Sequence, residues 1–200
     1  MNLETSAWQA AQSAYRIEAE AVANALTGIP EADFLRAARA LAAAPRIAAS
    51  GCGHSGIACM HFCHLMCCIE RPARFLSPAE ALHGASGYVQ AGDAMLLASR
   101  GGKTKELLPI EAICHKKGAT VIAVTENFAS PLAEGADIVL PLTVTRETDR
   151  YNSQGTTSFI VLSALFDALQ TALIELTDYQ NEQFALIHPG GAVGERLNQK

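Results

Sequence analysis

The sequence predicts a three-layer α/β/α domain built on a five-stranded parallel sheet, preceded by two helices. The first observation is that apolar segments of strand length alternate with helical segments from Arg46 onward. The second is that AMLLAS, TVIAVT and DIVLPL are continuous apolar runs, which is typical of strands buried on both faces. Half of the 200 residues are hydrophobic and only 18% are charged, which is enough for one sizeable core.

The expected elements follow from apolar periodicity and from the positions of glycine and proline. Residues 4–26 and 31–44 predict two helices that pack on the outside of the domain or on a partner subunit. The predicted strands are 46–50, 73–77, 94–99, 120–125 and 137–142, and the predicted helices are 55–68, 79–83, 104–117, 130–135 and 154–176. We expect residues 1–45 to form a helical extension and residues 46–200 to form the ligand-binding domain, together one compact unit.

Composition excludes several classes of partner. The formal net charge is −5 and no basic run is present, which argues against nucleic acid. We find no stretch of about 18 uninterrupted apolar residues of the kind a membrane helix needs. The N-terminus, Met-Asn-Leu-Glu-Thr, lacks the positive region and apolar core of a signal peptide. We therefore expect a cytoplasmic protein without a nucleic-acid or membrane partner.

The loop after the first predicted strand has the spacing GxGxxG, formed by Gly51, Gly53 and Gly56. Glycines there allow a tight turn, and the helix that follows directs its first N–H groups at an anion. A dinucleotide site would also need an acidic residue at the end of the second strand. Ser77-Pro78 stands there instead. We therefore favour a smaller phosphorylated ligand and expect no cofactor.

A second glycine-rich loop, Ser99-Arg100-Gly101-Gly102-Lys103-Thr104, follows the third predicted strand. It offers two hydroxyls, two cations and, in our interpretation, a helix N-terminus directly after Thr104. Backbone N–H groups, the helix dipole and a cation together make a phosphate cradle. The alternative is a solvated turn with incidental charges. We favour the cradle, because carboxyl ends of parallel strands are where such sheets bind ligands.

A further group of candidate functional residues is a cluster of cysteines. Cys59, Cys63 and Cys67 share one face of a predicted helix, with His61 and His64 nearby, which suggests a metal site. The spacing matches neither CxxC nor HExxH, and free cysteine commonly serves as a small core hydrophobe. We therefore expect core packing and no metal.

Four segments carry a resemblance to a known family: GHSG at 53–56, AEALHG at 79–84, SRGGKTKE at 99–106 and HPGGAVGERL at 188–197. Together they resemble the sugar isomerase (SIS) domain and, within it, the arabinose 5-phosphate isomerases. The resemblance implies a flavodoxin-like sheet, a sugar phosphate ligand, and a homodimer or homotetramer with active sites at subunit interfaces. Members of that branch often carry a C-terminal pair of CBS domains, and we expect any regulation that these give to be absent here.

The resemblance also implies roles for individual residues. Glu147 matches the glutamate that would take the proton from carbon 2, and His188 matches the histidine that would move the hydroxyl proton. His54 and His83 would polarise the carbonyl or open the sugar ring. Taken with the loops described above and the polar segment before the last long helix, the predicted substrate- and phosphate-binding residues are Gly53, Ser55, Ser99, Arg100, Gly101, Gly102, Lys103, Thr104, Ser153 and Thr156.

The chain departs from the family pattern at four positions: Gly101 replaces a serine, Lys103 a glutamate, His54 a lysine and Ala85 an aspartate. These changes alter the charge next to the phosphate. We therefore expect an aldose–ketose isomerase that works through an enediol on a sugar phosphate other than arabinose 5-phosphate. The alternative is a non-catalytic SIS module that senses a phosphosugar and acts on a partner protein. The retained Glu147 and His188 favour the enzyme, because a sensor needs no acid–base pair.

Overall fold

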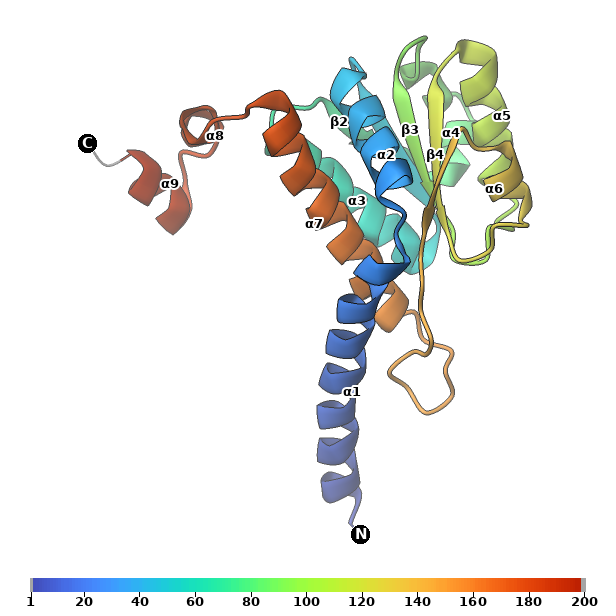
Figure 1. The fold of residues 1–200 in the computed structure, drawn as a ribbon, viewed down its shortest axis with the longest axis vertical. Helices are drawn as coiled ribbons and strands as arrows, with labels where there is room; N and C mark the ends of the chain where they lie inside the picture. Colours follow the sequence, from blue (N-terminus) through green and yellow to red (C-terminus); the bar gives the residue numbers. More distant parts are fainter. Residues whose placement is uncertain (1, 199–200) are drawn as a thin grey trace.

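A five-stranded parallel sheet forms the centre of the computed structural model, which describes residues 2–198 (Figure 1). Its strands are β1 (Ile47–Gly51), β2 (Ala73–Phe75), β3 (Ala94–Ala98), β4 (Thr120–Thr125) and β5 (Ile138–Pro141). Their order is β2-β1-β3-β4-β5, which is the flavodoxin-like order. The chain reverses its direction of winding between β1 and β3. The predicted parallel sheet is therefore confirmed.

Alternate residues of each strand face opposite helical layers. Leu96 of β3 and Ile122 of β4 pack with α2 (Glu31–Ala43), α3 (Gly53–Cys67) and α7 (Thr157–Thr177). Leu97 and Val121 pack with α4 (Pro78–Leu82), α5 (Leu108–Lys117) and α6 (Pro131–Gly135). Both strand faces are buried, which explains the continuous apolar runs in the sequence.

The two N-terminal helices differ in how much they bury. Helix α2 places Ala37, Ala38 and Leu41 in the core beside α7. Helix α1 (Leu3–Ala25) contacts α7 but buries only Ala21, and its N-terminal half projects from the body in Figure 1. The short 3-10 helix Leu26–Gly28 joins the two.

Two predicted helices start later than the sequence analysis expected. Helix α5 begins at Leu108 rather than at 104, because Pro109 fits only the first turn of a helix. No α-helix N-terminus therefore follows Thr104 directly. Helix α7 begins at Thr157 rather than at 154, because the Asp149 carboxylate accepts the N–H groups of Ser153 and Gln154 and holds them in a turn.

By length and composition alone, α7 could cross a membrane. Part of its apolar surface packs in the core, through Val161, Leu162, Leu165, Phe166, Leu169 and Leu173, whereas Ile160 and Leu176 are exposed.

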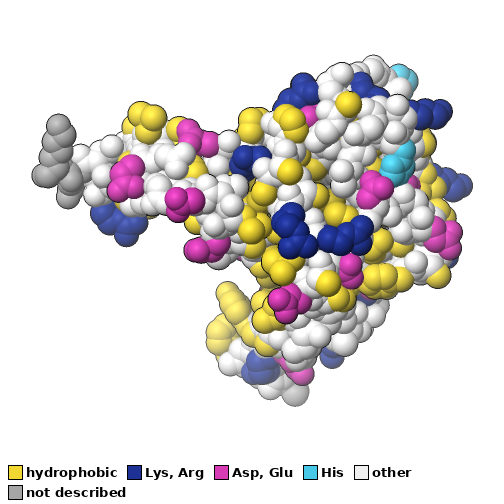
Figure 2. Space-filling model, turned by 45° about the horizontal axis from the view of Figure 1, so that its top comes forward, with side chains coloured by type: hydrophobic (Ala, Val, Ile, Leu, Met, Phe, Trp, Pro, Cys, Tyr) yellow, Lys and Arg dark blue, Asp and Glu magenta, His cyan; other side chains and the backbone are white. Residues whose placement is uncertain are grey.

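Two short helices follow α7, namely α8 (Asn181–Ile187) and α9 (Gly191–Asn198), and neither was among the predicted helices. We call residues 181–198 the C-terminal arm. Figure 1 shows it projecting from the end of α7, away from the sheet. Figure 2 shows exposed apolar side chains on this projection. Leu186, Ile187 and Val193 of the arm are exposed.

Candidate functional site

The loop at residues 99–104 has a closed and well-defined shape at the carboxyl end of β3. The hydroxyls of Ser99 and Thr104 lie 2.8 Å apart and are hydrogen bonded, and the Gly102 N–H donates to the Ser99 carbonyl at 3.0 Å. The loop is tied to the end of β4, where the Thr125 hydroxyl donates to the Arg100 carbonyl at 2.9 Å. Two of the predicted phosphate ligands, Ser99 and Thr104, are thus brought together.

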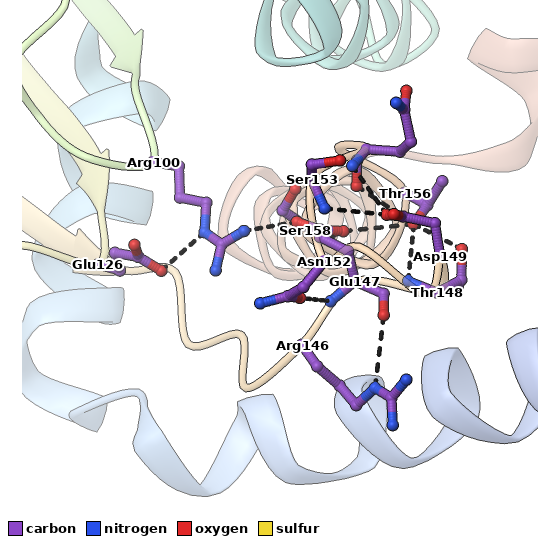
Figure 3. A network of polar contacts seen from close by, with 11 residues as sticks. Arg100, Glu126, Arg146, Glu147, Thr148, Asp149, Asn152, Ser153, Thr156 and Ser158 are labelled. Atoms are coloured by element: carbon purple, nitrogen blue, oxygen red, sulfur yellow. Dashed lines mark hydrogen bonds and ion pairs between the residues drawn. The ribbon is translucent and has the colours of Figure 1, made fainter.

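Glu147 is almost fully enclosed, with 1% of its side chain exposed. Its Oε1 accepts a hydrogen bond from Arg100 Nη1 at 2.6 Å. Its Oε2 accepts from the Ser158 N–H at 3.2 Å and from the Thr156 hydroxyl at 3.3 Å. Arg100 also donates through Nε to Glu126 at 2.8 Å, so one guanidinium joins two carboxylates (Figure 3).

The position of Glu147 at the first turn of α7 is electrostatically favourable. Ser158 carries one of the N–H groups that the helix itself cannot satisfy, and a carboxylate there also interacts with the positive end of the helix dipole. The backbone N–H of Glu147 donates to Asn152 Oδ1 at 2.6 Å, which fixes the start of the connecting turn.

Asp149 organises that turn, and the sequence analysis did not assign it a role. Its carboxylate accepts the N–H groups of Tyr151, Ser153 and Gln154 at 2.9, 3.0 and 2.8 Å. The N–H of Gln154 makes the largest contribution to holding the pKa of Asp149 below its ordinary value. The sequence signal was an aspartate before a short polar turn, a frequent Asx-turn pattern.

His54 lies at the start of α3 and contacts the turn that leads into α7. A Cβ placed on Gly155 would lie 3.0 Å from His54 Nδ1, and the rings of His54 and Phe159 are 6.2 Å apart, edge to face. The structure therefore places His54 beside Gly155, whose neighbour Thr156 binds Glu147.

Three of the other predicted ligands, Gly53, Gly101 and Lys103, line two clefts at this edge of the sheet. One, of about 600 Å³, is lined by Gly101, Lys103, Glu126, Asn127, Thr143 and Val144. The other, of about 370 Å³, lies between the first loop and the loop after β2, and Gly53 and Glu106 contribute to it. Ser55 is half-buried at the start of α3 and Ser153 is exposed. His83 is exposed at the end of α4, and among residues 2–198 it has no recorded hydrogen bond to the other predicted site residues.

His188 lies far from Glu147 within one chain. Glu147 binds the first turn of α7, whereas His188 ends α8, which follows the other end of α7. A helix of 21 residues is about 30 Å long. The C-terminal arm continues outward in Figure 1 rather than folding back. Nδ1 of His188 is buried and has no hydrogen-bond partner in the described part of the chain, and the ring lies 4.9 Å from that of Phe184.

The cysteine cluster is divided between core and surface. Cys59, Cys63 and Cys114 are buried, whereas Cys52 and Cys67 are exposed. Burial raises the pKa of Cys63 to about 12 and that of Cys114 to about 11. In the part of the chain that the structure describes, no three His, Cys, Asp or Glu side chains are placed to hold a metal ion.

The sequence is similar to a known domain family and to several curated proteins. The model of the SIS domain family matches residues 40–172. The arabinose 5-phosphate isomerase KdsD of Pseudomonas aeruginosa is 36% identical over 188 residues, which is 94% of this chain and 57% of KdsD. KpsF of Escherichia coli, also an arabinose 5-phosphate isomerase, is 37% identical over 74% of this chain and 47% of its own length. The chain thus spans about half the length of these curated relatives.

Solved structures agree with this fold. A Listeria monocytogenes protein, described as a proposed sugar-phosphate isomerase, superposes with a TM-score of 0.91 at 37% identity and covers 95% of this chain and 100% of that one. The Escherichia coli CFT073 protein c3406, solved in complex with arabinose 5-phosphate, has a TM-score of 0.87 at 27% identity and covers 94% of this chain and 100% of that one.

Proposed function

Because the chain belongs to the SIS domain family, we propose that it is a phosphosugar isomerase that interconverts an aldose phosphate and a ketose phosphate through an enediol. The observation that carries this proposal is Glu147. It lies at the carboxyl edge of the sheet and is joined through Arg100 to the loop that closes with the Ser99 and Thr104 hydroxyls. A carboxylate held next to a phosphate-binding loop is the arrangement that a proton transfer on a phosphosugar requires.

The proposed reaction moves protons only. Glu147 takes the proton from carbon 2 of the open-chain aldose, and the electron pair of that C–H bond forms a double bond between carbons 1 and 2. The carbonyl oxygen at carbon 1 gains a proton, which gives the enediol. The oxygen at carbon 2 then loses its proton and becomes the carbonyl, while carbon 1 takes a proton back from Glu147. General acid–base groups of this kind contribute about 10²–10⁴-fold each.

The charge pattern supports a substrate other than arabinose 5-phosphate. Lys103 in place of a glutamate adds two units of positive charge, and His54 in place of a lysine removes about one if His54 is neutral. Lys103 lines the cleft of about 600 Å³. We propose that the sugar phosphate carries a further acidic group that this cation recognises.

His188 enters this proposal from a second subunit. Its distance from Glu147 along α7 favours a homodimer or homotetramer in which the arm of one chain reaches the site of another. The exposed apolar side chains of the arm and of α1, such as Leu186 and Trp8, suit such contacts. We retain a cytoplasmic location as part of the proposal.

Proton NMR in D2O with a panel of pentose and hexose phosphates, including uronic acid phosphates that keep the aldehyde at carbon 1, tests the reaction. The expected result is deuterium at carbon 2 together with interconversion of aldose and ketose. The proposal fails if no member of the panel exchanges a proton while one of them binds.

That outcome would favour the second candidate, a non-catalytic SIS module that senses a phosphosugar. One observation supports it: the Glu147 carboxylate is almost fully enclosed, with 1% of its side chain exposed. The Vibrio vulnificus NanR protein, solved with ManNAc-6P, shares the fold with a TM-score of 0.75 at 22% identity. A sensor would show a ligand-induced rise in melting temperature without any exchange at carbon 2.

A further inference from the structure

We propose that Arg100 is a positioning residue of the reaction, which orients Glu147, rather than a ligand of the phosphate. The inference rests on the proposed function and deepens it. It starts from the two ion pairs of one guanidinium, to Glu126 at 2.8 Å and to Glu147 at 2.6 Å (Figure 3).

Two donors of Arg100 are directed at carboxylates. Its Nε faces Glu126, at the end of β4, and its Nη1 faces Glu147, ahead of α7. A planar guanidinium with both sides fixed in this way has little freedom to turn toward an anion elsewhere. The two glutamates supply two negative charges around this one cation, so the local field also disfavours an approaching phosphate.

The hydrogen bonds to Glu147 leave one acceptor position of its carboxylate open. A carboxylate has about four lone-pair positions on its two oxygens. Oε2 accepts from Thr156 and Ser158, so both of its positions are used. Among the residues that the structure describes, Oε1 accepts from Arg100 alone and keeps one position. Thr156 and Ser158 therefore leave Oε1 as the atom that takes the proton from carbon 2, and Arg100 holds this atom in its orientation.

Because Glu126 also holds Arg100, the orientation of Glu147 depends on the position of the loop at residues 99–104. Glu126 is 37% exposed, and its own N–H donates to the Arg100 carbonyl at 3.0 Å. Arg100 is thus held by its backbone and by its side chain to the same residue, in a loop that also carries Ser99 and Thr104. Displacement of the loop would displace Oε1, and a misplacement of about 1 Å can cost about 10²-fold in rate.

The kinetic test compares Arg100→Met, Arg100→Lys and Glu126→Gln, with Arg39→Met, an exposed arginine on α2, as the matched control. Arg100→Met should lower kcat about 10²-fold while KM and the inhibition constant of inorganic phosphate stay within about twofold. Arg100→Lys keeps the charge but contacts one carboxylate at a time, so it should recover part of kcat. Glu126→Gln should lower kcat less than Arg100→Met does. Arg39→Met should leave kcat, KM and the inhibition constant of phosphate unchanged. A raised KM and weaker phosphate inhibition at unchanged kcat would overturn the proposal, as would full activity of Arg100→Met.

A second measurement does not depend on turnover. In ¹⁵N NMR spectra of the full chain, the Ser158 N–H reports directly on Glu147, because it donates to Oε2. Arg100→Met should shift this resonance and speed its hydrogen exchange, while inorganic phosphate binds to the variant as it does to the unmodified chain. An unchanged Ser158 signal, or loss of phosphate binding, would overturn the inference. Absence of isomerase activity in the unmodified chain, with the Ser158 shift still present, would instead reject the proposed function alone.

Discussion

A Cβ placed on Gly102 would lie 1.9 Å from Oγ and 2.5 Å from Cβ of Ser130, the residue that caps α6. Gly102 also has a φ of +63°, a region that other residues rarely adopt. The absence of a side chain at Gly102 is therefore a condition for the closed shape of the loop at residues 99–104.

Gly102→Ala should consequently distort the loop and destabilise the protein. Both the positive φ and the contact with Ser130 oppose the added methyl group, so we expect a loss of about 2–4 kcal/mol in the free energy of unfolding. Denaturant titration measures it. Gly101→Ala is the matched control, because a Cβ there meets nothing within 4 Å, and its stability should stay within about 1 kcal/mol. Equal losses for both variants would show that Ser130 does not limit position 102.

Glu147→Gln should abolish turnover while the ligand still binds. The amide keeps the shape of the side chain and can still accept the N–H of Ser158, but it cannot take a proton from carbon 2. We expect kcat to fall by about 10²–10⁴-fold in the D2O exchange assay with little change in KM. Glu175→Gln, at an exposed position on the same helix, should retain full activity. Unchanged turnover of Glu147→Gln would reject Glu147 as the base.

Thiol labelling should distinguish the cysteines by burial. Only a thiolate reacts readily with iodoacetamide, and burial raises the pKa of Cys63 to about 12 and of Cys114 to about 11. In the folded protein at pH 8, we expect Cys52 and Cys67 to be labelled while Cys59, Cys63 and Cys114 stay protected. Peptide mass spectrometry reads the labels, and unfolding should expose all six cysteines. Rapid labelling of Cys63 in the folded state would contradict its place in the core.

The parallel sheet could be predicted from the sequence, but the residues that pair with one another in the site could not. Buried runs such as the one around Leu96 identify parallel strands, because both faces of each strand must be apolar. The pairing of Arg100 with Glu147 joins residues 47 positions apart, and it depends on where the loop after β3 lies relative to the turn before α7. No local pattern contains that information.

Local sequence patterns also failed to give the start of α5 and the position of the C-terminal arm. The prediction extended α5 to Thr104 because the loop looked like a helix start, although Pro109 marks the first turn more strongly. Glu147 and His188 were predicted to act together, whereas within one chain they lie toward opposite ends of α7. Sequence motifs identify such residues without saying which chain supplies them.

Glu111 should make the stability of the protein depend on pH. Glu111 is 6% exposed, and within residues 2–198 its Oε1 has no hydrogen-bond partner; Oε1 faces Gly135, whose missing Cβ leaves it room. Burial raises the pKa of Glu111 above its ordinary value of 4.5; nearby Asp137 adds to this, and His115 opposes it. Because the folded state holds this proton more tightly than the unfolded state, the contribution of Glu111 to stability is fully present below about pH 4.5 and is lost as the pH rises through the folded-state pKa.

Glu111→Gln removes that loss, so the variant should melt at a higher temperature than the unmodified chain at pH 7. The difference should shrink as the pH is lowered toward 4.5, which calorimetry at several pH values can follow. Glu134→Gln, at an exposed position on α6, should show no such difference. A Glu111→Gln variant that is less stable at pH 7 would mean that the charged carboxylate has a partner in the folded protein.

Mixing two inactive variants tests whether the site is shared between chains. Glu147→Gln lacks the base at one end of α7, and His188→Ala lacks the imidazole beyond the other end, about 30 Å away along the helix. If each site combines Glu147 of one chain with His188 of another, a mixed dimer contains one intact site, and random mixing should restore about a quarter of the unmodified turnover. The variants are unfolded together, refolded and assayed for exchange at carbon 2, with native mass spectrometry to count mixed oligomers. Mixed oligomers without activity would mean that Glu147 and His188 of different chains do not act together, and restored activity could come from no other arrangement, because neither chain alone carries both groups.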